Sequence, residues 1–134
     1  LNEVVESLKP PFSRDASSDG WLLDCTLGGG GHTAEFLKLG VRVLALDRDP
    51  VAIDEARFRF SKEISENRLR VENLAFSDAG KALEGVKLLG ILADLGFSSD
   101  QLETRGRGFS FQKDEPLDMR MNPEEGISAY EFLM

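Results

Sequence analysis

Short apolar runs separated by polar turns recur through most of the chain. Four of these runs are expected to be buried strands, at residues 21–23, 41–46, 69–71 and 88–93. Between them, apolar residues at spacings of three and four predict helices at residues 33–39, 50–64 and 77–83. Because strand and helix alternate, the pattern predicts an α/β fold with a parallel sheet and right-handed crossovers.

Two helix signals frame this alternating core. Residues 1–8 place apolar side chains on one helical face, and Pro10 and Pro11 are expected to end that helix because proline cannot donate the next ladder hydrogen bond. Farther along, Asp49 is expected to cap the next helix, since Pro50 suits the first helical position.

The pattern changes after the fourth strand. Residues 97–122 show no sustained period and are expected to form a long ordered loop, interpreted as an active-site loop. Ser128 and Glu131 then have the spacing of a capping box that opens a helix over residues 128–134. That helix stops after about two turns, so residues 1–134 are expected to be the N-terminal part of a larger domain.

Composition narrows the class of protein. The 134 residues are 41% hydrophobic and 30% charged, as in one small soluble domain or part of one. No apolar run approaches the ~20 residues of a membrane helix, and no signal peptide is recognisable, so no membrane association is expected. With 16 Lys and Arg against 24 Asp and Glu, the net charge is -8, which argues against a protein that binds nucleic acid through its overall charge. A single cysteine, Cys25, excludes an internal disulfide and favours a reducing, cytoplasmic compartment.

Three acidic residues follow the expected strands. Asp24, Asp47 and Asp94 come at the ends of the first, second and fourth strands, and in an open parallel sheet ligands bind at this edge. Asp47 lies 19 residues beyond Gly28, close to the ~20-residue offset at which an acid meets ribose hydroxyls. Since Asp49 is expected to cap the helix, Asp47 is left for a ligand.

At several other positions, a structural role competes with a role in ligand binding. The four glycines at residues 28–31 also suit a merely flexible turn. His32 stands at a helix start, where the dipole disfavours a positive charge, so a neutral structural role is open. Phe97 suits loop packing as well as base stacking. A nicotinamide-binding turn fits less well, because Thr33 stands where that fingerprint has glycine or alanine.

Two of the motifs resemble those of methyltransferases. Residues 24–30 resemble the D-x-G-x-G-x-G turn that binds S-adenosylmethionine, with Thr26 in place of the first glycine. Residues 94–97 are similar to the D-P-P-Y motif of amino-methyltransferases. Together, six segments along the chain resemble the bacterial 16S ribosomal RNA cytosine-N4 methyltransferase family, at residues 1–5, 24–32, 47–50, 94–99, 107–111 and 116–121.

This resemblance implies a Rossmann-like class I methyltransferase fold, S-adenosylmethionine as cofactor and a cytosine of small-subunit 16S ribosomal RNA as substrate. It implies no metal, and it singles out no catalytic group that activates the cytosine amine. By resemblance, seven residues would contact the cofactor: Gly30, Gly31, His32, Asp47, Phe76, Asp94 and Gln101. One departure is Glu115, which stands where the family usually has glycine and which bears on the shape of the loop.

The family is longer than this chain, and this has a physical consequence. Four strands in the order 3-2-1-4 would leave the fourth at an edge, with unpaired backbone groups. Self-association through that edge is therefore expected, and the apolar residues expected to be exposed there are Leu88, Leu89, Ile91 and Leu92.

Two other functions stay open at this point. One is a truncated, catalytically inactive module that binds S-adenosylmethionine or another protein. The other is an NAD-dependent oxidoreductase, which the glycine turn fits less well.

Overall fold

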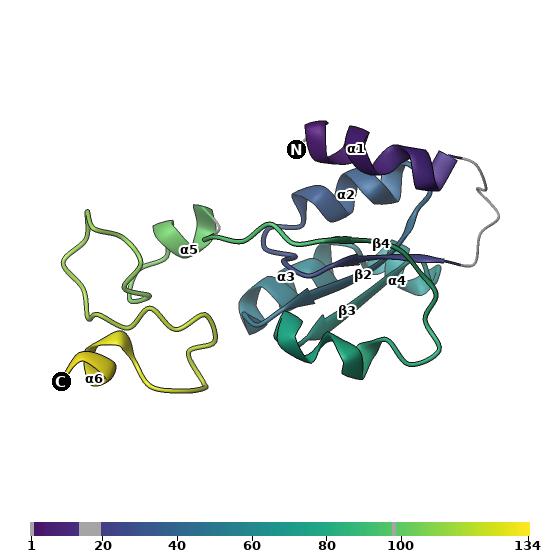
Figure 1. Cartoon of the computed structure of the whole chain (residues 1–134). Coiled ribbons are helices and arrows are strands. Elements are labelled where there is room, and N and C mark those ends of the chain that lie inside the picture. Colours follow the sequence, from purple (N-terminus) through teal and green to yellow (C-terminus); the bar gives the residue numbers. More distant parts are fainter. Residues whose placement is uncertain (1, 14–19, 98) are drawn as a thin grey trace. The chain divides into compact units, whose positions relative to one another are not determined.

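The computed structural model describes residues 2–13, 20–97 and 99–134. They fall into two compact units, Leu1–Asp94 and Leu95–Met134, which are described separately (Figure 1). No helix among these described residues is long and apolar enough to cross a membrane.

Unit 1 is a parallel sheet flanked by helices. Its elements are α1 (Asn2–Ser13), β1 (Trp21–Asp24), α2 (Gly31–Lys38), β2 (Arg42–Asp47), α3 (Pro50–Arg59), α4 (Ser61–Ser65), β3 (Leu69–Asn73), the 3-10 helix η1 (Phe76–Ala82) and β4 (Leu88–Leu92). The strands are all parallel and stand in the order β3-β2-β1-β4, which confirms the predicted α/β fold and strand order.

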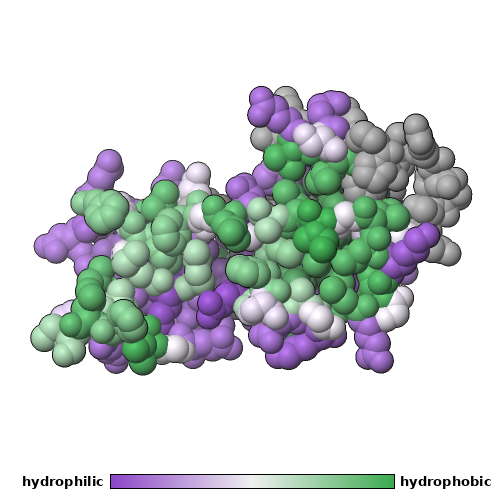
Figure 2. Space-filling model, viewed as in Figure 1, coloured by the Kyte–Doolittle hydropathy of each residue, from purple (hydrophilic) through white to green (hydrophobic). Residues whose placement is uncertain are grey.

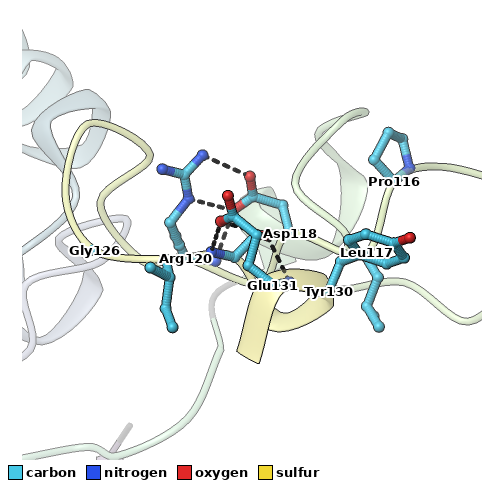
Figure 3. A pocket seen from close by; sticks show the side chains of 9 residues that line it. Pro116, Leu117, Asp118, Arg120, Gly126, Tyr130 and Glu131 are labelled. Carbon is cyan, nitrogen blue, oxygen red and sulfur yellow. Dashed lines mark hydrogen bonds and ion pairs between the residues drawn. The ribbon is translucent and has the colours of Figure 1, made fainter. Parts of the chain in front are cut away.

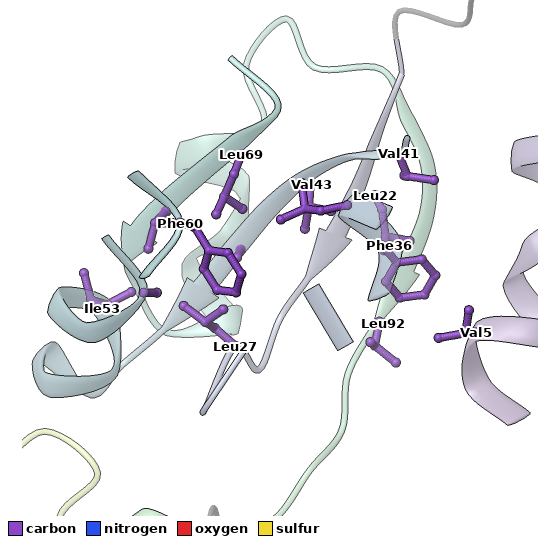
Figure 4. Packing of buried hydrophobic residues seen from close by; sticks show 14 residues of the cluster. Val5, Leu22, Leu27, Phe36, Val41, Val43, Ile53, Phe60, Leu69 and Leu92 are labelled. Atoms are coloured by element: carbon purple, nitrogen blue, oxygen red, sulfur yellow. The ribbon is translucent and has the colours of Figure 1, made fainter. Parts of the chain in front are cut away.

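Successive strand residues bury their side chains on opposite faces of this sheet. On one face, Leu22 of β1 and Val43 of β2 pack against Val5, Phe36 and Ile53 of the three helices α1, α2 and α3. Figure 4 shows the side chains of this apolar cluster spread along the sheet, from Ile53 at one end to Val5 at the other. The three helices therefore cover the same face.

The opposite face has a smaller core. Trp21 and Leu23 of β1 pack there with Leu44 and Leu46 of β2, and partly buried alanines of η1 lie against them. Two guanidinium groups also lie over the Trp21 ring: Arg42 Cζ is 4.1 Å and Arg70 Cζ is 4.5 Å from the ring centroid. The indole is thus held between the sheet and two cationic side chains, and it is only 3% exposed.

The first helix does not end where the sequence predicted. Pro10 and Pro11 were expected to stop it, but α1 continues to Ser13. Proline's fixed φ is compatible with the helical region, although proline removes a ladder hydrogen bond and its ring crowds the carbonyl four residues before it. Both prolines lie in the last turn of α1, where only two helical residues follow them.

The edge strand β4 is less exposed than predicted. Ile91 is 59% exposed, as expected, but Leu92 is buried. Its side chain belongs to the cluster that contains Val5 of α1, so this helix covers that side of the edge. Leu88 is partly buried against the second core. Leu89 is likewise only partly exposed. Self-association through this edge stays a prediction.

Unit 2 is held by hydrogen bonds more than by a core. It contains the short helices α5 (Ser99–Glu103) and α6 (Ala129–Leu133), of which α5 was not anticipated within the predicted loop. The predicted capping box is confirmed, because the Ser128 and Glu131 side chains each bond the other's backbone N–H. Figure 2 shows apolar side chains over α6, where Phe132 is 77% exposed.

A bidentate ion pair organises the centre of unit 2. Arg120 donates from Nε to Asp118 Oδ1 at 2.9 Å and from Nη2 to Asp118 Oδ2 at 2.8 Å. Hydrogen bonding from Arg120 lowers the pKa of the Asp118 carboxyl to about 2. Figure 3 shows this pair beside Glu131 and Tyr130 at a pocket of about 720 Å³. Glu115 adds a second anchor, since its carboxylate accepts from two backbone amides of the same loop.

Candidate functional site

The carboxyl ends of the strands in unit 1 carry the acidic residues singled out from the sequence. Asp24 is the last residue of β1, Asp47 is the last of β2, and Asp94 follows β4. Because the strands are parallel, these residues share one edge of the sheet. The glycine turn connects β1 to α2 at this same edge.

The last two glycines of the turn have different surroundings. Gly30 has φ +73°, and a Cβ placed on it would lie 2.8 Å from Cε2 of the buried Phe60 ring. Gly31 begins α2, and a Cβ there would meet nothing within 4 Å. Gly30 therefore serves the fold of the turn, whereas Gly31 leaves room at its surface for a ligand.

The Asp47 carboxylate is tied into the turn. Its Oδ2 accepts from the backbone N–H of Gly28 at 2.8 Å, and its Oδ1 accepts from that of Asp49 at 2.9 Å. The predicted cap is confirmed, since Asp49 itself accepts from Val51 N at 3.0 Å at the start of α3. A carboxylate has about four lone-pair sites, so Asp47 keeps two for ligand hydroxyls. It is therefore both an anchor of the turn and a candidate ribose contact.

Asp24 has a different role, because it is buried. Its side chain is 1% exposed and accepts from Thr33 Oγ1 at 2.8 Å and from Thr26 N at 3.1 Å. Burial raises the pKa of the Asp24 carboxyl, and these two hydrogen bonds act in the opposite direction. The Asp24 carboxylate thus links the end of β1 to Thr33 of α2 and to the main chain of the turn at Thr26.

Asp94 and His32 face each other across the mouth of the turn. The backbone N–H of Asp94 donates to Thr26 Oγ1 at 2.8 Å, while Asp94 Oδ2 lies 3.9 Å from His32 Nδ1. The Asp94 side chain is 69% exposed. His32 Nε2 is buried, and none of the described residues hydrogen-bonds it. Leaving a buried polar atom unpaired costs about 1–3 kcal/mol, so this geometry favours His32 as a ligand contact over a purely structural histidine.

The remaining predicted contacts lie apart from the turn in sequence. Phe76 follows β3 at the start of η1, and its side chain is 53% exposed. Gln101 lies on α5 in unit 2 and is mostly buried there. The Phe97 ring packs on Phe109 within unit 2, with centroids 4.7 Å apart, so loop packing is observed for it. Six of the seven predicted contacts therefore lie in unit 1.

These groups suit an adenosyl ligand. The edge offers a carboxylate with free lone pairs for a ribose diol, an open glycine surface and an exposed aromatic ring for a base. Among the described residues, no group of three or more His, Cys, Asp or Glu side chains is placed to hold a metal ion. The hydrogen-bond acceptors of Asp47 and the exposed ring of Phe76 are the groups that suit a nucleoside.

Two residues of the site were not anticipated as functional. Thr33 fixes the buried Asp24, and Thr26 reaches across to the chain after β4. For Thr26 the sequence did contain a signal, since a hydroxyl side chain stands where the general motif has glycine. For Thr33 the spacing of nine residues from Asp24 gave no comparable indication.

Relatives of this chain carry a consistent name. Three of them, each named ribosomal RNA small subunit methyltransferase H, come from Prochlorococcus marinus (strain NATL1A), Gemmatimonas aurantiaca and Clostridium botulinum (strain Hall). The first is 39% identical over 98% of this chain, the second is 45% identical over 84%, and the third is 43% identical over 97%. The chain spans 42%, 36% and 41% of their respective lengths.

A family model described as the MraW methylase family matches residues 1–134, the whole of the chain. The resemblance inferred from the motifs is confirmed by this match and by the names of the relatives. The chain, with its parallel sheet and glycine turn, belongs to the MraW methylase family.

Proposed function

We propose that this chain is the cofactor-binding part of a methyltransferase that uses S-adenosylmethionine and modifies the N4 amine of a cytosine in small-subunit 16S ribosomal RNA. The observation that carries the proposal is the Asp47 carboxylate, which ends β2 and accepts from Gly28 of the glycine turn. It lies in a chain that matches a methylase family over its whole length. When bound, S-adenosylmethionine supplies a methyl group made electrophilic by its sulfonium.

Binding of the cofactor follows from the groups at the strand edge. Asp47 accepts from the ribose hydroxyls with the lone pairs that the turn leaves unused, and its charge disfavours a phosphate at that position. The exposed ring of Phe76 stacks on the base, and the surface beside Gly31 admits the ligand next to the main chain. Gly30, His32 and Asp94 are proposed as the further contacts in unit 1. By resemblance, Gln101 of α5 is also proposed as a cofactor contact.

A ribosomal RNA substrate is proposed from the relatives' name together with the chemistry of cytosine. The lone pair of the exocyclic amine is delocalised into the ring, so the enzyme must present acceptors and align the amine with the methyl group. The Asp94 carboxylate is exposed and is an acceptor at this edge. The base is expected to leave its stack to reach the site, and residues 97–122 are proposed as the loop that receives it.

Calorimetric titration of the chain with S-adenosylhomocysteine tests cofactor binding. Asp47→Asn keeps the shape of the side chain but loses its charge, so affinity is expected to fall about tenfold or more. Asp54→Asn is the matched control, since Asp54 pairs with Arg57 on the exposed face of α3 and should leave affinity unchanged. A folded chain that fails to bind, or that binds equally well after Asp47→Asn, contradicts the proposal.

Transfer of a labelled methyl group to small-subunit particles tests the reaction itself. Transfer by the chain supports the full proposal. Binding of S-adenosylhomocysteine without transfer is the outcome shared by a cofactor-binding part acting alone and by the alternative, a catalytically inactive cofactor-binding module. A change in NADH fluorescence on mixing, with no binding of S-adenosylhomocysteine, would instead favour an oxidoreductase.

A further inference from the structure

We infer that Thr26 is a positioning residue of the cofactor site. Its hydroxyl oxygen fixes the main chain at Asp94 and so holds the Asp94 carboxylate at the mouth of the glycine turn. This inference rests on the proposed function, because it assigns the contact with the cofactor to Asp94 and gives Thr26 an indirect role.

The geometry of Thr26 supports an indirect role. Its backbone N–H donates to the buried Asp24 carboxylate at 3.1 Å, which fixes the residue from beneath. Its Oγ1 accepts from the backbone N–H of Asp94 at 2.8 Å. Next to it, Cys25 N donates to Leu92 O at 2.8 Å, continuing the pairing of β1 with β4. The hydroxyl therefore extends the link between these strands beyond the last ladder hydrogen bond.

The segment that Thr26 holds needs such a link. Asp94 is the last residue of unit 1, and its side chain is 69% exposed. Its carboxylate is held only loosely by His32, since Oδ2 lies 3.9 Å from His32 Nδ1, beyond hydrogen-bond distance. Without the hydroxyl, the Asp94 N–H bonds to water and the carboxylate samples more positions. A threonine is well suited to this task, because its branched Cβ restricts rotation about χ1.

The residue type at this position also explains the departure from the general motif. A glycine here would satisfy the backbone of the turn but would supply no acceptor for the chain after β4. In this protein the acceptor is present, and it spans 68 residues of sequence. The threonine thus joins two parts of the site through a side-chain acceptor that glycine lacks.

The test is a double-mutant cycle read by calorimetric titration with S-adenosylhomocysteine. Thr26→Val removes the hydroxyl and keeps the shape, so affinity is expected to fall about two- to tenfold, as for one lost hydrogen bond. Thr26→Ser keeps the acceptor and should restore affinity to within about twofold of the wild type. In an Asp94→Ala background, Thr26→Val should have no further effect, because the carboxylate that it positions is gone.

Thr33→Val is the matched control. It removes a threonine hydroxyl from the first turn of α2, next to the glycine turn, but that hydroxyl donates to Asp24 and does not contact the Asp94 segment. Any effect of Thr33→Val on affinity should be equal with and without the Asp94 carboxylate. Thermal unfolding of every variant separates lost stability from lost affinity. If Thr26→Val does not fold, Thr26→Ala removes the same hydroxyl and takes its place.

Three results overturn the inference. They are unchanged affinity in Thr26→Val, an equal loss in Thr26→Val and Thr26→Ser, and a loss in Thr26→Val that persists in full after Asp94→Ala. Failure of the wild-type chain to bind S-adenosylhomocysteine refutes the proposed function, and this inference with it. That outcome is distinct from the first three, in which the wild type binds.

Discussion

Replacing Gly30 by alanine should destabilise unit 1 strongly. Gly30 has φ +73°, and a left-handed conformation costs a residue with a Cβ roughly 1–2 kcal/mol. The new methyl group would also lie 2.8 Å from Cε2 and 3.2 Å from Cζ of Phe60. Since Phe60 is buried, its ring has no solvent to move into, and overpacking of this kind costs about 1–3 kcal/mol. The expected loss is about 2–5 kcal/mol, against a typical total of about 5–15 kcal/mol.

Urea denaturation followed by tryptophan fluorescence measures this loss. Trp21 is the chain's single tryptophan and is buried in unit 1, so its emission reports the unfolding of that unit. With a slope of about 1–3 kcal/mol per molar urea, a loss of about 2–5 kcal/mol lowers the midpoint of Gly30→Ala by about 0.7–5 M. The slope itself should stay the same, because the surface exposed on unfolding is unchanged.

Gly31→Ala is the adjacent control. A Cβ at Gly31 meets nothing within 4 Å, and the residue lies in the first turn of α2, so the free energy of unfolding should change by no more than about 0.5 kcal/mol. The same variant should weaken binding of S-adenosylhomocysteine, because the methyl group occupies the surface proposed for the ligand. Equal midpoints for Gly30→Ala and the wild type, or equal losses in the two variants, would refute the reasoning.

Three further predictions concern charges and hydrogen bonds outside the turn. The Arg120 amide donates to the Asp118 carboxylate, so its NMR shift should titrate with a midpoint near 2 rather than 3.8; the ion pair is complete above about pH 4 and is lost as the pH falls through about 2. Glu115→Ala should shift the NMR signals of the Gly106 and Gly108 amides, which donate hydrogen bonds to the Glu115 carboxylate, while the thermal unfolding of unit 1 stays unchanged. Arg70→Met should alter the emission of Trp21 and lower stability by about 0.5–1 kcal/mol, and an unchanged spectrum would contradict the stacked geometry.

Much of the secondary structure could be predicted from the sequence because its signals are local. The strand ends at Asp24 and Asp47, the cap at Asp49 and the capping box at Ser128 each depend on a few neighbouring residues. The single helix expected over residues 50–64 is instead two, because Phe60 leaves helical geometry between α3 and α4. Its ring packs into the core, a tertiary contact that periodicity does not reveal.

The contacts that organise the site join residues far apart in sequence, so they could not be predicted. The spacing of Asp47 from Gly28 indicated a ligand contact, but it did not show that this carboxylate also holds the turn. The sequence pattern predicted that Leu92 lies exposed on an edge strand, but it did not show that α1 covers this face of β4. The link from Thr26 to Asp94 depends on β4 lying next to β1, which only the fold establishes.

The unequal covering of the two sheet faces in unit 1 has a dynamic consequence. One face carries three α-helices, whereas the other is covered by η1, a 3-10 element without a buried side chain. Such helices have poorer hydrogen-bond geometry, so η1 should open at a lower free energy than the sheet beneath it, and its amide hydrogens should exchange first. Phe76 begins this element. A nucleoside stacked on that ring would hold η1 closed, and part of its binding energy would be used to order the protein rather than to raise affinity.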